Sequence, residues 1–509
     1  MSKAKSGKCF LVGAGPGDLG LVTLRAKECI ERADVIVYDC FANPEILKWA
    51  PESAEIICAG DKTGGNALTQ DEINALLVAQ AREGKQVVRL TGDDPFLFGS
   101  GAEEAQTLVA ARIPFVVVPG VTSGIAGPAY AGIPMTNRGK NSHVTFFAGH
   151  EGPEKSGSSI AFSALAKLGG TQMLQMGLER LDEITREMLA SGIRSDLPVA
   201  LIRWATTGRQ ETLIGNLENI TRLVAERGFE APAVAIFGDV VDLRKKLAWF
   251  EAGPLWGKRI VVTCARAQSA VLAGQLRDLG ADVIELPTIR IEPPTNLREF
   301  AEMVQDAHVY DWILFTSPNA VTAFFELFYK LYDDTREIGG VRIAAIGSAT
   351  AQRVRDFHLK VDFQEEDAIT ESVAREFRKR EGLENLRVLM ARAEQARDVL
   401  PKELSALGAI VDEGFAYRVV PEMRDNWGAR ERLLEEGADL ITFTSSSAVE
   451  NFMALNLRLP AGMKIASVGP VTSMTAREHG LEVAVEARQH DIPGFVSAVR
   501  KYFGRQEDK

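Results

Sequence analysis

Residues 89–102 read RLTGDDPFLFGSGA, and residues 12–19 and 118–135 read VGAGPGDL and VPGVTSGIAGPAYAGIPM. Each glycine- and proline-rich bend follows a short apolar run, a pattern that predicts a turn at the C-terminal end of a β-strand. Shorter bends of this kind occur at residues 37–40 and 148–151. In α/β sheets, ligands bind beyond the carboxyl ends of the strands, and glycine lets the backbone approach them closely. The bends therefore predict one shared cleft in the first half of the chain, which we expect to be an enzyme.

The composition is that of an ordinary globular protein. Of the 509 residues, 46% are hydrophobic and 25% are charged, and this length requires several domains. No apolar run reaches the roughly eighteen residues of a membrane span, and the basic N-terminus lacks the apolar core of a secretory signal. The five cysteines show no CxxC or zinc-knuckle spacing. The cysteine pattern therefore predicts a reduced, cytoplasmic, metal-free protein. A net charge of −11 argues against nucleic-acid binding but does not exclude a small polyanionic substrate.

Strand-like and helix-like runs alternate along almost the whole chain, which predicts α/β layers. We expect strands at 9–13, 34–39 and 86–90, and helices at 23–33 and 69–84. A second α/β block runs from about residue 142 to residue 243. The stretch WFEAGPLWGK at 249–258 mixes aromatic residues with glycine and proline and has neither period. We therefore predict a first domain at 1–245, a linker at 246–256 and a second domain at 257–503.

The second half contains an internal repeat. FTSPNAV at 315–321 corresponds to FTSSSAV at 443–449, an offset of 128 residues. RIAAIGSATA at 342–351 and KIASVGPVTS at 464–473 form a further pair. Two similar α/β units that face each other create a cleft, so we expect a second binding site here.

The motif GAGPGD at 13–18 superficially resembles the dinucleotide fingerprint GxGxxG. However, Asp18 occupies the position of the third glycine, which permits close packing of helix on strand, and Pro16 lies inside the turn. A nicotinamide site is therefore disfavoured. A purely structural turn remains an alternative for this motif alone, but the later bends favour a ligand cleft.

The ordered set of motifs resembles the tetrapyrrole methyltransferases, and within them the uroporphyrinogen-III C-methyltransferases. The resemblance covers about residues 8–243 and depends on GAGPGD at 13–18, VYD at 37–39, GDDPFLFG at 92–99, PGVTS at 119–123, PAYAGIP at 128–134 and PAVAIFGDVV at 232–241. It implies two α/β subdomains with S-adenosylmethionine held between them. It also implies two successive methyl transfers that yield precorrin-2.

The same resemblance implies the roles of individual residues. The cofactor pocket would be lined by Pro16, Gly92, Asp93, Asp94, Leu97, Thr122, Ser123, Met176, Ala205 and Ala233. Asp39 stands at the position of the proton acceptor, and a carboxylate at the edge of a cleft suits that task. The alternative for Asp39 is a helix cap that follows the strand.

This chain departs from the family pattern at several positions. The family usually has lysine at Asp61 as the proton donor, lysine at Thr91, glycine at Asp93, arginine at Ser100 and histidine at Asn137. These changes make the site less attractive to a substrate that carries eight carboxylates, because unlike charges at close range contribute about 1–4 kcal/mol each. Lys62 is the candidate for replacing the missing amine. We therefore keep open a methyltransferase that is slow or altered in substrate preference.

The second half resembles the uroporphyrinogen-III synthases over about residues 257–503. The resemblance depends on VVTCARAQ at 261–268, ELP at 285–287, AIGSAT at 345–350, YRVVP at 417–421, SVGPVTS at 467–473 and the two FTS repeats. It implies two lobes joined by a two-stranded linker, with lobe one at 257–291 plus 421–503 and lobe two at 293–418. Cys264 stands where fused versions usually have arginine.

The synthase reaction closes linear hydroxymethylbilane with inversion of ring D and loss of water. Its reactive azafulvene intermediate needs orientation more than strong catalytic groups. Carboxylates of the substrate would be bound by Thr316, Ser317, Ser348, Thr350, Thr444, Ser445, Ser446 and Thr472. Tyr417 is the candidate for assisting departure of the hydroxyl group. The alternatives are ordinary helix capping for the hydroxyl residues and simple packing for Tyr417.

The product of the second family is the substrate of the first, so we predict a bifunctional enzyme that converts hydroxymethylbilane to precorrin-2 on the route to sirohaem or cobalamin. The synthase half needs no cofactor. Competing hypotheses are an active synthase joined to a degenerate or other-precorrin methyltransferase, and a scaffold that binds tetrapyrroles without turnover. The family resemblance implies a homodimer through the N-terminal half. From the net charge and the lack of a long apolar run we expect no nucleic-acid or membrane partner.

Overall fold

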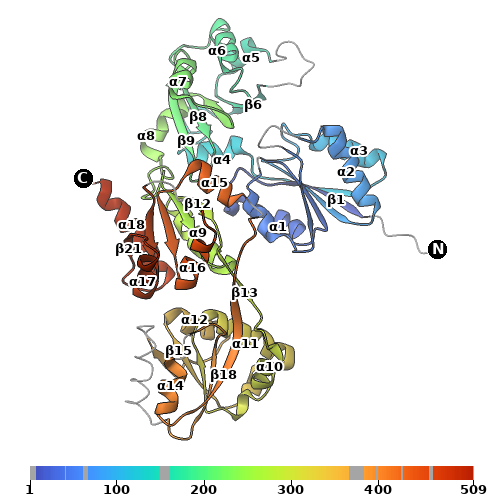
Figure 1. Ribbon diagram of the computed structural model, residues 1–509. Coiled ribbons are helices and arrows are strands. Elements are labelled where there is room, and N and C mark those ends of the chain that lie inside the picture. Colours follow the sequence, from blue (N-terminus) through green and yellow to red (C-terminus); the bar gives the residue numbers. More distant parts are fainter. Residues whose placement is uncertain are drawn as a thin grey trace, which may run out of the picture. The chain divides into compact units, whose positions relative to one another are not determined.

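The computed structural model describes residues 7–40, 42–60, 67–149, 160–365, 383–396, 399–425, 428–457 and 462–507. The chain divides into two compact units: unit 1 comprises Met1–Lys258 with Arg277–Asp282, and unit 2 comprises Arg259–Leu276 with Val283–Lys509. Figure 1 shows that each unit is built from sheets with helices packed against them, as the alternating sequence pattern predicts.

The first sheet of unit 1 is entirely parallel and has the strand order β3-β2-β4-β1-β5. The strands are β1 (Lys8–Gly13), β2 (Val35–Tyr38), β3 (Glu55–Cys58), β4 (Gln86–Thr91) and β5 (Phe115–Val118). The helices are α1 (Leu24–Ile30), α2 (Gln70–Arg82), α3 (Gly101–Ala110) and α4 (Ser123–Tyr130), with 3₁₀ turns η1 (Leu19–Leu21) and η2 (Pro44–Trp49). Leu11, Val37 and Val87 of the strands pack against Leu77 of α2 and Leu108 of α3. Because every strand runs the same way, their carboxyl ends share one edge of the sheet.

Two of the helix starts follow directly from local chemistry. The Thr23 side chain accepts a hydrogen bond from Ala26 N–H and begins α1. Thr69 and Glu72 form a reciprocal capping box at the start of α2. The predicted helices at 23–33 and 69–84 are thus confirmed, although each is shorter than expected at its C-terminal end.

The second sheet of unit 1 is mixed and has the order β6-β7-β10-β8-β9. Its strands are β6 (Val144–Ala148), β7 (Thr171–Gln175), β8 (Pro198–Arg203), β9 (Glu211–Asn216) and β10 (Ala233–Phe237). Only the β6–β7 pair is parallel among the pairs described for this sheet. The accompanying helices are α5 (Phe162–Leu168), α6 (Leu181–Ala190), α7 (Ile220–Arg227), η3 (Asp239–Leu243) and α8 (Arg244–Leu247). Unit 1 therefore consists of two α/β subdomains.

The stretch predicted as a linker packs against α4 inside unit 1. The Trp249 indole Nε1–H donates to the carbonyl of Ala129 at 2.9 Å, and the Tyr130 ring lies 5.1 Å from Trp249 and 4.9 Å from Phe250 between centroids. Glu251 forms an ion pair with Arg244. The aromatic residues that interrupt the periodicity of this stretch thus hold it against α4, through the ring contacts and the indole hydrogen bond.

Lobe one of unit 2 contains a sheet in the order β12-β11-β19-β20-β21, in which the pairs β11–β19, β19–β20 and β20–β21 are parallel. The strands are β11 (Arg259–Val262), β12 (Asp282–Glu285), β19 (Leu440–Phe443), β20 (Lys464–Ser467) and β21 (Val483–Glu486). The helices are α9 (Arg266–Asp278), α15 (Ala429–Glu436), α16 (Ser446–Ala454), α17 (Pro470–Glu478) and α18 (Ile492–Glu507). The lobe is thus assembled from two separate stretches of chain.

Lobe two lies between those stretches in sequence and has the strand order β13-β18-β17-β14-β15-β16. The strands are β13 (Ile289–Glu292), β14 (Trp312–Phe315), β15 (Arg342–Ile346), β16 (Phe363–Glu365), β17 (Arg387–Ala393) and β18 (Ile410–Pro421). The helices are α10 (Leu297–Gln305), η4 (Ala307–Val309), α11 (Pro318–Leu331), η5 (Thr335–Ile338), α12 (Ser348–Asp356) and α14 (Val399–Ala406). Its core is aromatic, with Phe315, Phe324, Phe325 and Phe328 fully buried together.

Two antiparallel strands connect the lobes of unit 2. β13 pairs with the end of β18, so that Ile289 lies opposite Pro421 and Glu292 lies opposite Arg418. The chain leaves lobe one along β13 and returns along β18, which makes lobe two an insertion. No helix in the described part of the chain has both the length and the apolar character needed to cross a membrane.

Candidate active sites

Bends that follow three strands of the first sheet meet in unit 1. Gly15 and Asp93 exchange two backbone hydrogen bonds, of 3.2 Å from Gly15 N–H and 3.0 Å from Asp93 N–H. A Cβ at Gly120 would lie 2.0 Å from the Asp93 carbonyl, and one at Gly13 would lie 2.5 Å from the same oxygen. Only glycine permits this approach, so the glycines of the β1 and β5 bends are required by the contact with the β4 bend.

The second subdomain contributes further bends to the same place. Asp18 N–H, in the β1 bend, donates to Thr206 Oγ1 at 3.0 Å. A Cβ at Gly127 of α4 would lie 3.2 Å from the Ala205 Cβ. The two subdomains therefore meet at the carboxyl ends of their strands, where a ligand cleft was expected.

Backbone strain is concentrated at these bends. Asp93, Met176, Trp204 and Thr206 have φ values of 55°, 49°, 47° and 67°, and they follow β4, β7 and β8. A positive φ in such residues costs on the order of 1–3 kcal/mol and is typical of functional sites. The strain supports a binding role for this junction.

The Asp93 carboxylate lies at the centre of a polar cluster. It accepts hydrogen bonds from Ser123 N–H at 2.9 Å, Ser123 Oγ–H at 2.5 Å and the Gln175 amide at 3.3 Å. The Gln175 amide also donates to Thr122 Oγ1 at 3.0 Å. Burial raises the pKa of Asp93, although the hydrogen bonds from Ser123 and Thr122 act in the opposite direction. Gln175 Oε1 is buried and has no hydrogen-bond partner among the described residues.

The remaining predicted cofactor residues lie in the same bends. Asp94 accepts hydrogen bonds from Phe96 N–H and Gly120 N–H, at 2.8 and 3.0 Å, and so joins the β4 and β5 bends. The other predicted residues differ mainly in their exposure. Ala205 is buried, Met176 is exposed, and the half-buried ones are Pro16, Gly92, Leu97 and Ala233. Gln175 and Thr206 were not predicted, because single polar residues at strand ends give no distinctive sequence signal.

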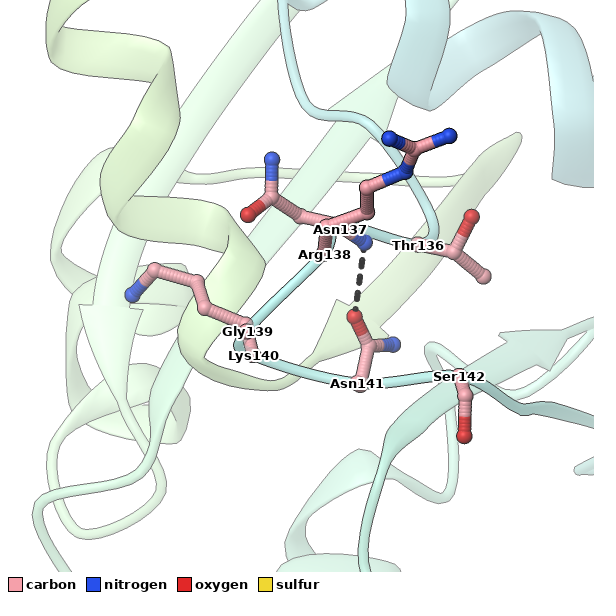
Figure 2. A pocket seen from close by; sticks show the side chains of 7 residues that line it. All are labelled: Thr136, Asn137, Arg138, Gly139, Lys140, Asn141 and Ser142. Atoms are coloured by element: carbon pink, nitrogen blue, oxygen red, sulfur yellow. Dashed lines mark hydrogen bonds between the residues drawn. The ribbon is translucent and has the colours of Figure 1, made fainter.

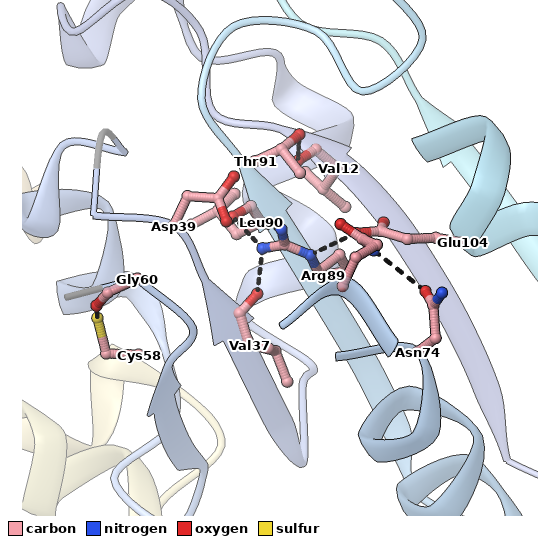
Figure 3. A network of polar contacts seen from close by, with 11 residues as sticks. Val12, Val37, Asp39, Cys58, Gly60, Asn74, Arg89, Leu90, Thr91 and Glu104 are labelled. Carbon is pink, nitrogen blue, oxygen red and sulfur yellow. Dashed lines mark hydrogen bonds and ion pairs between the residues drawn. The ribbon is translucent and has the colours of Figure 1, made fainter. Parts of the chain in front are cut away.

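Asp39 lies at the carboxyl end of β2 and is 29% exposed. Figure 3 shows its carboxylate directed at the guanidinium of Arg89, with Nη2 and Oδ1 2.6 Å apart. Arg89 Nε lies 2.8 Å from Oε1 of Glu104 on α3. The alternative that Asp39 caps a helix is wrong, since the cap of the following η2 is Asn43, whose side chain accepts from Glu45 N–H. Lys62 and Asp61 lie outside the described residues.

Sequence reasoning missed Arg89 and Glu104. The signal in the sequence was a charge that interrupts the apolar run at 87–90, and in the structure the Arg89 side chain is only 3% exposed. Glu104 stands next to Glu103 in the first turn of α3, and nothing in the sequence distinguishes the buried carboxylate from the exposed one.

The departures from the family pattern have different structural settings. Thr91 is buried, and its hydroxyl donates to the carbonyl of Val12 at 3.4 Å. Ser100 precedes α3 without a side-chain cap bond. Asn137 belongs to the loop between α4 and β6, whose residues 136–142 line the pocket in Figure 2. The Asn137 N–H donates to Asn141 Oδ1 at 3.0 Å, and the exposed Arg138 makes this pocket basic.

The candidate hydroxyl residues of unit 2 gather at helix N-termini in both lobes. Ser317 caps α11 and Ser445 caps α16, each accepting from the N–H three residues on, Ala320 or Ala448. Their φ and ψ angles agree closely, −161° and 159° against −163° and 159°, so the internal repeat extends to backbone detail. These two hydroxyls therefore cap helices, and binding of substrate at the same helix starts stays a prediction.

The other candidate hydroxyl residues lie near the starts of α11 and α16 or of α12 and α17. Thr316 Oγ1 donates to the Ala391 carbonyl at 3.3 Å, and Ser446 Oγ donates to the Val471 carbonyl at 3.4 Å. Ser348 begins α12, while Thr350 of α12 and Thr472 of α17 are buried. Thr444 directly follows β19.

Tyr417 lies on β18 and is buried. Its hydroxyl oxygen is 3.0 Å from Ser317 Oγ. Burial raises the pKa of Tyr417, against the lowering effect of hydrogen bonds with Ser317 and Asn319. The hydroxyl thus reaches the start of α11, which simple packing of the ring does not require.

Comparisons with known proteins divide the chain in the same way. The model of the Tetrapyrrole (Corrin/Porphyrin) Methylases matches residues 8–221, and the model of Uroporphyrinogen-III synthase HemD matches residues 270–497. The porphyrin biosynthesis protein HemD of Ruminiclostridium josui is 34% identical over 476 residues, which cover 93% of this chain and 94% of that protein. A uroporphyrinogen-III C-methyltransferase of Bacillus subtilis is 38% identical over 348 residues, covering 68% and 71%.

Two further similarities concern the first half. An S-adenosyl-L-methionine-dependent uroporphyrinogen III methyltransferase of Methanosarcina barkeri is 50% identical over 237 residues, which cover 47% of this chain and 93% of that protein. A crystal structure of uroporphyrin-III C-methyl transferase from Thermus thermophilus with S-adenyl homocysteine is 34% identical, with a TM-score of 0.40, and covers 47% of this chain and 100% of that chain.

Proposed function

The chain belongs to the tetrapyrrole methylases in its N-terminal part and to the uroporphyrinogen-III synthases in its C-terminal part, and we propose that it performs both steps in succession. It closes hydroxymethylbilane to uroporphyrinogen III with inversion of ring D, and then methylates the product twice to precorrin-2, on the route to sirohaem or cobalamin. The proposed domains are residues 1–245 and 257–503, with lobe one of the synthase at 257–291 plus 421–503 and lobe two at 293–418.

The single observation that carries the methyltransferase proposal is the meeting of the glycine bends of the first subdomain with the bend after β8 of the second. S-adenosylmethionine, the methyl donor of this family, fits this site. Its sulfonium and ammonium groups are cationic, and Asp93 supplies a carboxylate at the junction. The buried, unpartnered Gln175 Oε1 is a further acceptor in the described part of the site. The proposed holding residues are Pro16, Gly92, Asp93, Asp94, Leu97, Thr122, Ser123, Met176, Ala205 and Ala233.

When bound, S-adenosylmethionine supplies an electrophilic methyl group to a pyrrole carbon. The methylated macrocycle then has one proton in excess, which must leave. Asp39 is the proposed acceptor, because its carboxylate is partly exposed at a strand end and can reach a substrate proton. Lys62 is the proposed donor in place of the lysine that the family has at Asp61.

The proposed synthase site orients its substrate. The N-termini of α11, α12, α16 and α17 present N–H groups and hydroxyls that suit carboxylates. The proposed binding residues are Thr316, Ser317, Ser348, Thr350, Thr444, Ser445, Ser446 and Thr472. Tyr417 assists departure of the hydroxyl group, since its own hydroxyl lies beside Ser317 at a helix start.

A second candidate for the first half is a slow methyltransferase or one that prefers another precorrin. Asp93 supports it, because a carboxylate stands where the family has glycine and its side chain fills part of the junction. Thr91 supports it as well, since its buried hydroxyl cannot attract the anionic substrate as lysine would.

The test uses the full-length chain, hydroxymethylbilane and S-adenosylmethionine, with mass spectrometry of the products. A mass gain of two methyl groups that depends on the methyl donor supports the methyltransferase step, and chromatographic separation of the equal-mass isomers formed with and without inversion of ring D tests the synthase step. Uroporphyrinogen III as the sole product assigns activity to unit 2 alone and favours the second candidate. Light scattering of the same sample tests the proposed homodimer.

A further inference from the structure

Arg89 places a permanent positive charge inside the first sheet of unit 1. It lies on β4 between Val88 and Leu90, both of which are fully buried. Its side chain is 3% exposed, and Figure 3 shows it between Asp39 and Glu104. A buried guanidinium is stable only when charged partners and hydrogen bonds replace its hydration. The identity of those partners therefore indicates what the charge does.

The guanidinium is held on each of its nitrogens. Nη2 donates to Asp39 Oδ1 at 2.6 Å and Nε donates to Glu104 Oε1 at 2.8 Å. Nη1 donates to the carbonyls of Val37 and Leu90 at 3.4 and 3.3 Å. Because all three nitrogens are hydrogen-bonded, the guanidinium group is held in one orientation, and this fixes the position of Asp39 Oδ1.

The two carboxylate oxygens of Asp39 therefore differ in their hydrogen bonding. Oδ1 is held by Arg89, whereas no hydrogen bond from the described residues reaches Oδ2. The side chain is 29% exposed, so a substrate can approach it. The oxygen left open is the one that can accept a proton.

Glu104 is the second carboxylate of the cluster and is fully buried, with 0% exposure. Oε1 accepts from Arg89 and, at 3.3 Å, from the Gln70 amide. Oε2 has no partner within the described part of the chain. One guanidinium therefore faces two carboxylates, and the cluster has one negative charge in excess when both are ionised.

We propose that Arg89 and Glu104 are positioning residues for proton acceptance by Asp39, an inference that rests on the methyltransferase function proposed above. As the C–H bond breaks, its electron pair stays with the macrocycle and an O–H bond forms at Asp39 Oδ2. The cluster then changes from one excess negative charge to neutrality, which a buried site favours. If Glu104 were absent, protonation of Asp39 would leave the buried Arg89 cation without a negatively charged partner, which is unfavourable.

The test compares Glu104→Gln with Glu103→Gln in the full-length chain. Both changes remove one negative charge from the first turn of α3, but Glu103 is exposed and outside the cluster. We expect Glu104→Gln to lower kcat for methylation of uroporphyrinogen III about 10- to 100-fold, part of the 10²- to 10⁴-fold that a positioned base contributes. KM and the Kd for S-adenosylmethionine, measured by calorimetry, should not change, and Glu103→Gln should stay within about twofold of the starting kcat.

A double-mutant cycle separates positioning from general structural damage. In the Asp39→Asn background, Glu104→Gln should lower kcat no further, because its effect passes through Asp39. Equal effects of Glu104→Gln in both backgrounds, or an effect no larger than that of Glu103→Gln, would overturn the inference. If Glu104→Gln does not fold, Arg89→Lys provides the test, because lysine keeps the positive charge but cannot make the planar set of guanidinium hydrogen bonds. An unchanged kcat in this variant refutes the positioning role. A loss of kcat without a change in KM supports it.

These outcomes differ from failure of the proposed function itself. A starting protein that neither binds S-adenosylmethionine nor methylates uroporphyrinogen III contradicts that function and this inference together. An active starting protein whose Glu104→Gln variant is equally active contradicts only the inference.

Discussion

Unit 1 surrounds its candidate site with charged side chains, whereas the candidate residues of unit 2 are uncharged hydroxyls. In unit 1, Asp39, Arg89 and Glu104 form a partly buried ionic cluster, and Asp93 lies at the junction of the subdomains. In unit 2, hydroxyls and helix N-termini provide the polar contacts. The difference corresponds to the two reactions, since methylation must remove a proton, while closure of a reactive intermediate mainly needs a fixed conformation.

We expect the largest effect from a substitution that removes the Asp39 carboxylate from the candidate site of unit 1 and leaves unit 2 unchanged. Asp39→Asn keeps the shape of the side chain but cannot take up a proton as a carboxylate does. We expect methylation of uroporphyrinogen III to fall by roughly 10²- to 10⁴-fold, the usual contribution of a positioned base. Synthase turnover of hydroxymethylbilane in the same protein sample should not change, and a parallel loss there would break the comparison between the units.

Tyr417→Phe makes the converse test on unit 2. It removes the hydroxyl that lies 3.0 Å from Ser317 Oγ and leaves the ring in place. We expect synthase kcat to fall about tenfold, the equivalent of one hydrogen bond of about 1.4 kcal/mol. Rates of uroporphyrinogen III formation measure the effect, and normal turnover would assign Tyr417 to packing alone.

Ser317→Ala and Ser445→Ala sharpen the comparison within the repeat of unit 2. Each removes one helix cap, so each should lower the free energy of unfolding by about 1 kcal/mol in urea denaturation. Ser317→Ala also removes one hydrogen-bond partner of the Tyr417 hydroxyl, so we expect it to slow the synthase more than Ser445→Ala does. Equal turnover in the two variants would separate Tyr417 from the chemistry.

The smallest expected effect concerns the stability of unit 1 as a function of pH. Burial raises the pKa of Asp93 above its value in the unfolded chain, so the folded state holds the proton more tightly. The associated stability is present below the unfolded pKa of about 3.9 and is lost as pH rises through the folded pKa. Asp93→Asn does not ionise, and its Tm relative to the unaltered protein should therefore be higher at neutral pH than at a pH below about 3.9. Scanning calorimetry measures this difference, and the opposite trend would show that ionised Asp93 stabilises the fold.

Much of the fold was predictable because local chemistry specifies it. The bends after β1, β4 and β5 were identified from glycine and proline, and the start of α2 from Thr69 and its acidic first turn. The repeat in unit 2 was visible in the FTS motifs, and the structure extends it to the caps at Ser317 and Ser445. Helix ends were placed less well, since the last turns depend on contacts outside the helix.

The candidate site was only partly predictable. Asp39 was identified by resemblance, but its partners were not, because Arg89 and Glu104 are separated from it by 50 and 65 positions in the sequence. Glu103 and Glu104 are chemically identical neighbours, and only the packing of α3 on the sheet buries one and exposes the other. The contacts of the stretch at 246–256 were likewise hidden, since Trp249 and Phe250 pack against Tyr130, more than 110 positions earlier in the sequence.

The sequence by itself determined the α/β layers, the order of the bends, the repeat and the two families, because these depend on residues close together along the chain. Only the tertiary structure decided which carboxylates pair with Arg89 and which hydroxyls cap helices. It also decided that the Asp93 side chain accepts hydrogen bonds from Ser123 and Gln175. Such contacts join segments that are far apart in sequence. Their free energy depends on burial, which no single residue type reveals before the chain has folded.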